Sequence, residues 1–336
     1  MKKGMLLLLS IIMILLLSGC NQTQDTNPNE PAGVSFESLR LLAAEHPELD
    51  FGISRHDGQR TIRDFAITED GNLLLLELSA KVYEYSLKGE LLGSYDFGFD
   101  EKGLTAYMFT CDNQGNFYFI DGHNCLIIKA DRIGILNTAS LGEKSIITEP
   151  GLIKSISALE ENILIVAATS PDDFLTYTYK LDVSGDNAIC ITEPQVGIEL
   201  GNGLSYKNEL ITNEDGGLTS GTAVTIYENG VEKNKFEVHS RNNFIVGLNI
   251  YGLTQSGGYF ARIFEFLADG NTAQETFVIL DDRGKVISIC DGFLKNDDLI
   301  RGYNDNTFVL RFEADGITVF PLLELFTTNE DESWFK

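Results

Sequence analysis

A turn followed by a strand recurs along this chain, and this repeat limits the fold more than any other feature of the sequence. The segment "TEDGNLLLL" has counterparts in "CDNQGNFYFI", "LEENILIVA", "YKNELIT", "QSGGYFARIF" and "YNDNTFVLRF". One turn residue of each unit serves as an anchor: Asn72, Asn116, Asn162, Asn208, Gly258 and Asn306. Neighbouring anchors are 44 to 50 residues apart, and a period in this range is typical of propellers.

The four leucines after the first anchor, Leu73 to Leu76, are predicted to form a strand rather than a helix. Asn and Gly tolerate the backbone angles of a tight hairpin, and an inner strand packed between two sheets need not alternate in polarity. A second set of polar turns lies between the anchors, at Gly89, Gly134, Gly185, Gly230 and Gly284. Each unit therefore holds four short antiparallel strands, the composition of a propeller blade.

The repeat predicts an all-β domain, a six-bladed β-propeller of four-stranded antiparallel blades, over residues 50–326. The sixth unit lacks a second glycine hairpin before the acidic tail at 327–336. A strand from the beginning of the domain is expected to supply the missing edge, and Asp50 to Arg55 ("DFGISR") is the candidate. This arrangement closes the ring and removes an exposed sheet edge.

The register of the repeat, seen best in "DNQGNFYFIDGHNCLIIKADRIG" (112–134), resembles that of the NHL and TolB-like six-bladed propellers. The resemblance covers roughly residues 51–325. It implies that ligands bind on the face that carries the loops between second and third strands. It does not imply one activity, because such folds host unrelated functions.

The N-terminus is predicted to be a lipoprotein signal peptide, residues 1–19. Lys2 and Lys3 precede an apolar run from Met5 to Leu17, which is short for a membrane span and fits a signal sequence. Leu17 to Cys20 ("LSGC") is similar to the lipobox of bacterial lipoproteins. That resemblance implies lipidation, such as palmitate attachment, at Cys20. The expected location is the extracytoplasmic face of the cell membrane, within the cell envelope; an ordinary secretory signal is the alternative.

Two short segments separate the predicted anchor from the propeller. Residues 20–33 are polar with two prolines, a composition typical of a flexible tether. Residues 34–49 contain the best helix candidate, in which Phe36, Leu39 and Ala43 share one face and Pro47 ends the helix. We expect this helix to pack at the edge of the domain.

The formal net charge of −25 limits the partners. Nucleic acids and anionic lipid surfaces are attracted by clustered Lys and Arg, so neither is expected to bind the domain. Cations and basic partners are electrostatically favoured, although a diffuse acidic surface with no specific partner has the same composition.

No motif for catalysis, a metal or a cofactor stands out. The four histidines form no metal or triad signature. "CDNQGNF" has some features of a calcium loop but lacks its twelve-residue frame, so we interpret it as a hairpin. Cys111, Cys125, Cys190 and Cys290 have no evident partner within disulfide reach, and they are expected to be free, buried thiols.

The segment between the anchor and the next glycine turn is longer in units three to five than in units one and two. Added residues gathered on one face of a repeat protein often mark its binding side. We therefore expect the longer segments of units three to five to form an acidic recognition face. One further candidate lies on an innermost strand beside the channel. The candidate ligand-binding residues are Asp172, Asp173, Glu214, Asp215, Asp269 and Arg301.

The leading functional hypothesis is a membrane-anchored lipoprotein whose propeller binds a protein, peptide or small ligand on the acidic loop face. The alternative is a propeller enzyme, a metal-assisted hydrolase or lyase that uses carboxylates at the central channel. A structural or adhesive envelope protein is a third possibility. A neighbouring carboxylate is the simplest partner for Arg301.

Overall fold

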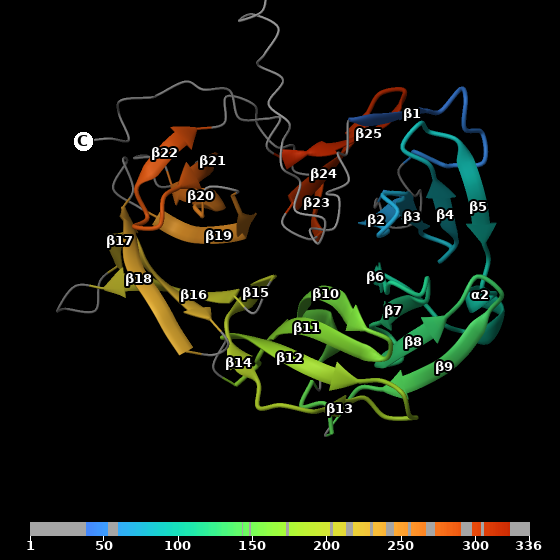
Figure 1. The fold of residues 1–336 in the computed structure, drawn as a ribbon, viewed down its shortest axis with the longest axis horizontal. Helices are drawn as coiled ribbons and strands as arrows, with labels where there is room; N and C mark the ends of the chain where they lie inside the picture. The colour runs from blue at the N-terminus through green and yellow to red at the C-terminus, as the bar shows by residue number, and fades with distance from the viewer. Residues whose placement is uncertain are drawn as a thin grey trace, which may run out of the picture. The chain divides into compact units, whose positions relative to one another are not determined.

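Six antiparallel sheets follow one another along the chain and around a ring, which confirms the predicted six-bladed β-propeller (Figure 1). The computed structural model describes residues 38–52, 60–142, 144–147, 149–172, 175–201, 204–212, 218–228, 231–239, 245–254, 257–266, 273–289, 298–303 and 306–322. All of them belong to one unit of the chain, Phe36–Lys336. The predicted signal peptide, the tether, Cys20 and the acidic tail lie outside the described residues.

The first three blades are built from short strands and are numbered in chain order. Blade one holds β2 (Ile62–Ile67), β3 (Leu73–Glu77), β4 (Val82–Tyr85) and β5 (Leu91–Tyr95). Blade two, which follows the helix α2 (Phe99–Lys102), holds β6 (Met108–Cys111), β7 (Phe117–Asp121), β8 (Leu126–Ala130) and β9 (Ile135–Ser140). Blade three follows the 3-10 turn η1 (Pro150–Leu152) and holds β10 (Ile153–Glu160), β11 (Ile163–Thr169), β12 (Thr176–Asp182), β13 (Ile189–Cys190) and β14 (Gln195–Val196).

The remaining three blades have longer strands on average. Blade four holds β15 (Ile198–Gly201), β16 (Leu204–Thr212), β17 (Leu218–Glu228) and β18 (Val231–His239). Blade five holds β19 (Ile245–Leu253), β20 (Tyr259–Phe266), β21 (Ala273–Leu280) and β22 (Val286–Ile289). Blade six holds β23 (Leu299–Tyr303), β24 (Asn306–Glu313), β25 (Gly316–Pro321) and, as its outer strand, β1 (Leu39–Leu42).

The ring is closed by β1, so two predictions for the start of the domain are wrong. Leu39 to Leu42 form a strand rather than part of a helix over 34–49, and the closing strand is β1 rather than Asp50 to Arg55. The physical reason is the alternation of polarity. Leu39 and Leu41 are buried between blades six and one, whereas Arg40 points to solvent and pairs with Asp315 at 2.9 Å. Burial of this period-two pattern outweighs the local helical pattern, and the propeller begins at 39 rather than 50.

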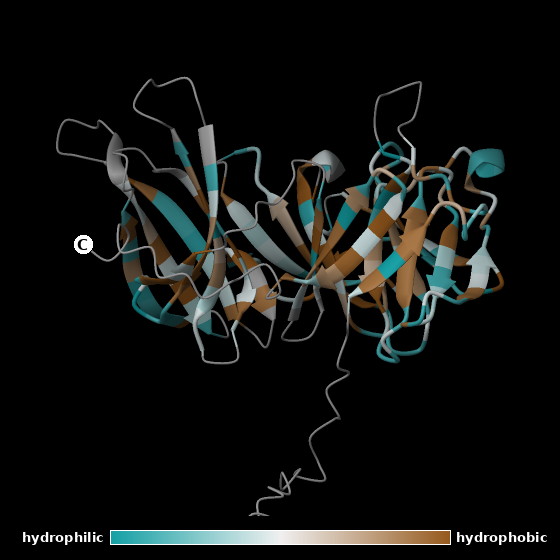
Figure 2. Ribbon diagram, turned by 90° about the horizontal axis from the view of Figure 1, so that it is seen from above, coloured by the Kyte–Doolittle hydropathy of each residue, from teal (hydrophilic) through white to brown (hydrophobic). Residues whose placement is uncertain are grey.

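Apolar clusters hold neighbouring blades together. The clusters join blades six and one, one and two, two and three, four and five, and five and six. Between blades one and two the cluster is aromatic, with five packed rings: Phe97, Phe99, Phe109, Phe117 and Phe119. Hydrophobic residues accordingly run along the strands, while many of the turns at their ends are hydrophilic (Figure 2). The inner strand Leu73–Glu77 has four consecutive buried leucines, as its position between two sheets requires.

The predicted hairpins form wherever the structure describes their turns, with two corrections. In blades one, two and five the left-handed residue is the glycine before the anchor, namely Gly71, Gly115 and Gly257, because these turns need positive φ one position earlier. In blade four the predicted anchor Asn208 is wrong. It lies in the middle of β16, opposite Val224, and its side-chain amide donates to the Leu248 carbonyl of blade five. The first turn of that blade falls at 202–203, outside the described residues.

The up-and-down order gives the propeller two distinct faces. We call the face with the turns between first and second and between third and fourth strands the hairpin face. The opposite face, with the loops between second and third strands and the connections between blades, is the loop face. Leu42 pairs with Gly316 at the start of β25 and Leu39 with Val319 towards its end. Since β25 starts at the loop face, the chain enters β1 from the hairpin face.

The part of the chain that the structure describes has three free cysteines, Cys111, Cys125 and Cys190, all partly buried. This confirms unpaired thiols at these positions, while Cys290 lies outside the described residues. Burial raises the pKa of Cys111 to about 12, so its thiol is protonated and unreactive at neutral pH. No helix in the described ranges is both long enough and apolar enough to cross a membrane.

Candidate ligand-binding site

Of the predicted acidic residues, the structure describes Asp172. It is exposed in the loop 170–175 between β11 and β12, on the loop face, as expected. Asp173, Glu214, Asp215 and Asp269 lie outside the described residues. The idea that the extra length of the later blades lies in loops is only partly right. The loop 170–175 is longer than 78–81 and 122–125, but in blade four the added residues also extend the strands, since β17 has 11 residues and β4 has 4.

Asp172 lies at the edge of a pocket of about 580 Å³, which we call the blade-three pocket. Three chain segments meet there: the end of β11 with its loop, the facing residues of β12, and the connection from blade two. The lining residues are Ile146, Ile147, Glu149, Ala168, Thr169, Ser170, Pro171, Asp172, Tyr177, Tyr179 and Pro194. All these segments are at the loop-face end of the blade, so the pocket opens on the face predicted to bind ligands.

The connection 141–152 between blades two and three forms one wall of the pocket. Ser145 fixes its bend, since its hydroxyl donates to the Gly142 carbonyl at 2.9 Å and accepts from the Gly142 N–H at 3.0 Å. The Cys190 N–H donates to the Lys144 carbonyl at 3.0 Å. Ile147 is buried in the core while Ile146, at positive φ, is 54% exposed beside the pocket. Hydrogen bonds within the connection and from Cys190 of blade three therefore hold this wall in place.

The outer edge of blade three is interrupted, and the interruption contributes to the pocket. β13 and β14 both pair with β12, at Leu181–Cys190 and at Tyr177–Val196. The residues between these two strands leave the sheet, and Pro194 among them lines the pocket. Proline lacks an N–H donor, so it cannot continue the ladder.

Two tyrosines on β12 form the pocket's aromatic wall. Tyr177 and Tyr179 project to the same side of the strand, and their ring centroids are 6.4 Å apart. Tyr179 is 5% exposed within the apolar cluster between blades two and three, and Tyr177 packs against the same cluster. Both rings thus pack against the core.

A second, smaller pocket of about 270 Å³ lies on the loop face between blades one and two. It is lined by Arg63, Leu78, Ala80, Asp100, Leu104, Thr105, Ala106 and Tyr107. Burial raises the pKa of Tyr107 to about 12, so the phenol is neutral at physiological pH. Charges of both signs line this pocket, and neither sign dominates.

Arg301, the predicted channel residue, has an acidic partner. Its Nε lies 2.6 Å from Oδ1 of the fully buried Asp64. The Asp64 carboxylate also accepts the N–H groups of Phe65 at 2.8 Å and Phe109 at 3.0 Å. One carboxylate thus connects the innermost strands of blades six, one and two. Burial raises the pKa of Asp64, although Arg301 and the two N–H groups oppose that shift.

The loop 122–125 of blade two lies on the same face, and the carboxylate of Asp121 holds it in place. Buried Asp121 accepts hydrogen bonds from the N–H and hydroxyl of Thr105, the N–H of His123, and the N–H and side-chain amide of Asn124. Burial alone would raise the pKa of Asp121, but these hydrogen bonds outweigh it and hold the pKa below its ordinary value.

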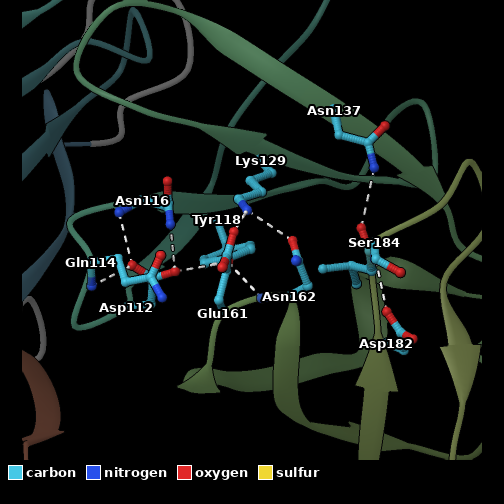
Figure 3. A network of polar contacts seen from close by, with 11 residues as sticks. Asp112, Gln114, Asn116, Tyr118, Lys129, Asn137, Glu161, Asn162, Asp182 and Ser184 are labelled. Carbon is cyan, nitrogen blue, oxygen red and sulfur yellow. Dashed lines mark hydrogen bonds and ion pairs between the residues drawn. The ribbon is translucent and has the colours of Figure 1, made fainter.

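On the hairpin face, "CDNQGNF" forms a hairpin, as interpreted from the sequence. Asp112 accepts the N–H groups of Gln114 and Asn116, the Asn116 amide, and the Tyr118 hydroxyl (Figure 3). Tyr118 in turn accepts the Asn162 N–H of blade three. Over the described ranges, no group of three or more His, Cys, Asp or Glu side chains is arranged to hold a metal ion.

Sequence reasoning missed most of the blade-three pocket. It named Asp172, which lines the pocket and whose role in binding stays a prediction, but it did not name the tyrosine wall, the bent connection or Pro194. One signal was available: Tyr177 and Tyr179 alternate in "TYTYK", directly after the acidic loop. The contribution of 146–149 depends on packing between blades, which no local pattern shows.

No family model matches the chain, and no curated protein matches it. Several solved structures are similar at low identity. Virginiamycin B lyase from Staphylococcus aureus has 10% identity, covering 85% of this chain and 98% of that chain, with a TM-score of 0.42. The propeller domain of the Trilobed protease from Pyrococcus furiosus has 13% identity, 80% and 84% coverage, and a TM-score of 0.42. YCF48 from Cyanidioschyzon merolae has 12% identity, 79% and 96% coverage, and a TM-score of 0.40. None of these likenesses bears on function.

Proposed function

We propose that this protein is a lipid-anchored, extracytoplasmic binding protein whose loop face recognises a protein, peptide or small ligand. The observation that carries the proposal is the blade-three pocket. It has the volume of a ligand site, an aromatic wall that packs against the core and a few polar groups at its rim. Pockets of this size and composition are the usual starting point for assigning a binding site.

The enzyme alternative receives less support from the described residues. Asp64 is a buried carboxylate on an innermost strand, and its oxygens are engaged by Arg301 and two backbone N–H groups. A general acid or base needs to reach the reacting atoms, and this carboxylate instead joins three blades.

The anchor is tested by expressing the full chain in a bacterium that is fed labelled palmitate. We expect the wild type to carry the label and sediment with membranes, and Cys20→Ser to lose both properties. Unlabelled wild-type protein in the soluble fraction would contradict lipid anchoring.

The binding face is tested by site-specific photocrosslinking on intact membranes. A crosslinking residue is placed at Asp172, on the loop face, or at Glu90, which is exposed on the hairpin face of blade one. We expect discrete adducts at 172 and few at 90. Equal crosslinking at both positions, or none at 172, would contradict a loop-face binding module.

A further inference from the structure

We propose that the blade-three pocket binds an organic cation, with its ammonium or guanidinium group beside Asp172 and Glu149 and its apolar part against Tyr177. The inference rests on the proposed binding function and names the ligand chemistry of that site. It follows from the charge of the rim, the nature of the walls and the size of the space.

The charge at the rim has one sign. Asp172 from the blade-three loop and Glu149 from the connection 141–152 are both exposed and both line the pocket. None of the described lining residues is Lys, Arg or His. The whole chain has a formal net charge of −25, which adds to the negative field around the pocket. An anion is repelled from this site, and a cation is attracted to it.

The walls select an organic cation over a simple ion. Tyr177 and Tyr179 offer ring surfaces, and Ile147, Pro171 and Pro194 add apolar area. An ammonium or guanidinium group near a tyrosine ring gains a cation–π interaction, and attached carbon groups gain apolar contact. A bare metal ion would use neither kind of surface, and it would leave most of the roughly 580 Å³ unfilled.

The required chemistry exists in two sources, a Lys or Arg side chain of a peptide and a small amine. Three probes distinguish them by calorimetry with the full chain in detergent: a tripeptide with arginine between two leucines, the same peptide with neutral citrulline, and tetramethylammonium. We expect the arginine peptide to bind about tenfold more tightly than the citrulline peptide. Comparable binding of tetramethylammonium would identify small amines as sufficient, whereas its absence would identify a peptide as the source.

Variants locate the binding. We expect Asp172→Asn and Glu149→Gln each to weaken the arginine peptide about three- to fivefold. Tyr177→Leu should weaken it further, and Tyr177→Phe should restore most of the affinity because the ring remains. The matched control is Glu90→Gln, which removes one acid on the opposite face and should change nothing. Melting of each variant reports whether it is folded.

Equal affinity for arginine and citrulline peptides, or unchanged binding by Asp172→Asn and Glu149→Gln, would overturn the cation proposal. A different result would contradict the proposed function, namely the loss of selective crosslinking at position 172. Selective adducts at 172 without cation binding would leave a loop-face binding module that takes another ligand. Adducts at neither position would remove the binding module itself.

Discussion

Asp121 of blade two and Asp172 of blade three lie in neighbouring blades on the same face, near equivalent loops, yet their environments are opposite. Asp121 is buried and accepts five hydrogen bonds from the connection before blade two and from its own loop. Asp172 is exposed at the rim of an open pocket. The carboxylate of Asp121 is therefore used up in holding the blade-two loop, whereas the carboxylate of Asp172 is exposed and can contact a ligand.

The contrast teaches that the many acids of this chain do not form one class. Asp64, Asp112 and Asp121 bind N–H and O–H groups of the protein and define turns or join blades. Asp172 and Glu149 face solvent beside aromatic walls. A count of charges cannot separate the two groups, but substitution can, because removal of a buried carboxylate should lower the free energy of unfolding strongly and removal of an exposed one should not.

The largest effect is expected at Asp64. Asp64→Ala leaves Arg301 and the Phe109 N–H without this acceptor, and breaking a buried ion pair costs about 3–5 kcal/mol. Urea unfolding followed by far-UV circular dichroism measures the loss. Arg301→Ala and the double variant complete a cycle, and strong coupling between the two positions is expected.

A cost below about 1 kcal/mol for Asp64→Ala, or additive effects of the two single changes, would show that the contact does not join the blades. In that case Arg301 would be a candidate for binding an anionic ligand at the channel.

The next effect is expected at Asp121. Asp121→Ala leaves buried donors on Thr105 and Asn124 without their acceptor, at a cost of about 3 kcal/mol for the group. Asp121→Asn keeps the shape and some hydrogen bonds and should cost less. Urea midpoints rank the two variants, and equal midpoints for wild type and Asp121→Ala would remove the distinction between the two loops.

The pH dependence at Asp121 has a definite sign. Its folded-state pKa is held below the ordinary value, so the unfolded chain binds the proton more readily. Its stabilisation is therefore complete above the unfolded pKa of about 3.9 and is lost as the pH falls through the lower folded pKa. We expect the stability gap between wild type and Asp121→Asn to narrow from about pH 5 to pH 3. A constant gap over this range would contradict the assignment.

The fold was predictable because it depends on repetition. Turn residues such as Gly89 and Asn162 recur at a blade period, and the leucine-rich inner strand needs two covering sheets. The start of the ring was not predictable in the same way. Leu39 fits a helical stripe with Phe36 and Ala43, and it also fits a strand alternation with Leu41. Only the edge of blade six, far away in sequence, decides between the two patterns.

The site was predictable in part. The position of Asp172 on the loop face was predictable because loop length is a local property, and its role in binding stays a prediction. Ile146, Glu149 and Pro194 reach the pocket through packing between blades and a break in the outer strand, which single-sequence patterns do not encode. The same limit applies to Asn208, whose turn-like context is overruled by a contact to Leu248 of the next blade.

The smallest stability effect is expected at Asp172, and it completes the comparison. Asp172 is exposed, and its backbone N–H donates a hydrogen bond to the Ser170 hydroxyl at 3.3 Å, which does not involve the carboxylate. Asp172→Asn should therefore change the free energy of unfolding by less than about 0.5 kcal/mol. Urea unfolding of Asp172→Asn and of Asp121→Asn, measured side by side, checks this expectation, because both variants carry the same chemical change. A loss as large as that of Asp121→Asn would mean that the blade-three loop is also held by its carboxylate, and the pocket rim would then be part of the fold instead of a surface for a partner.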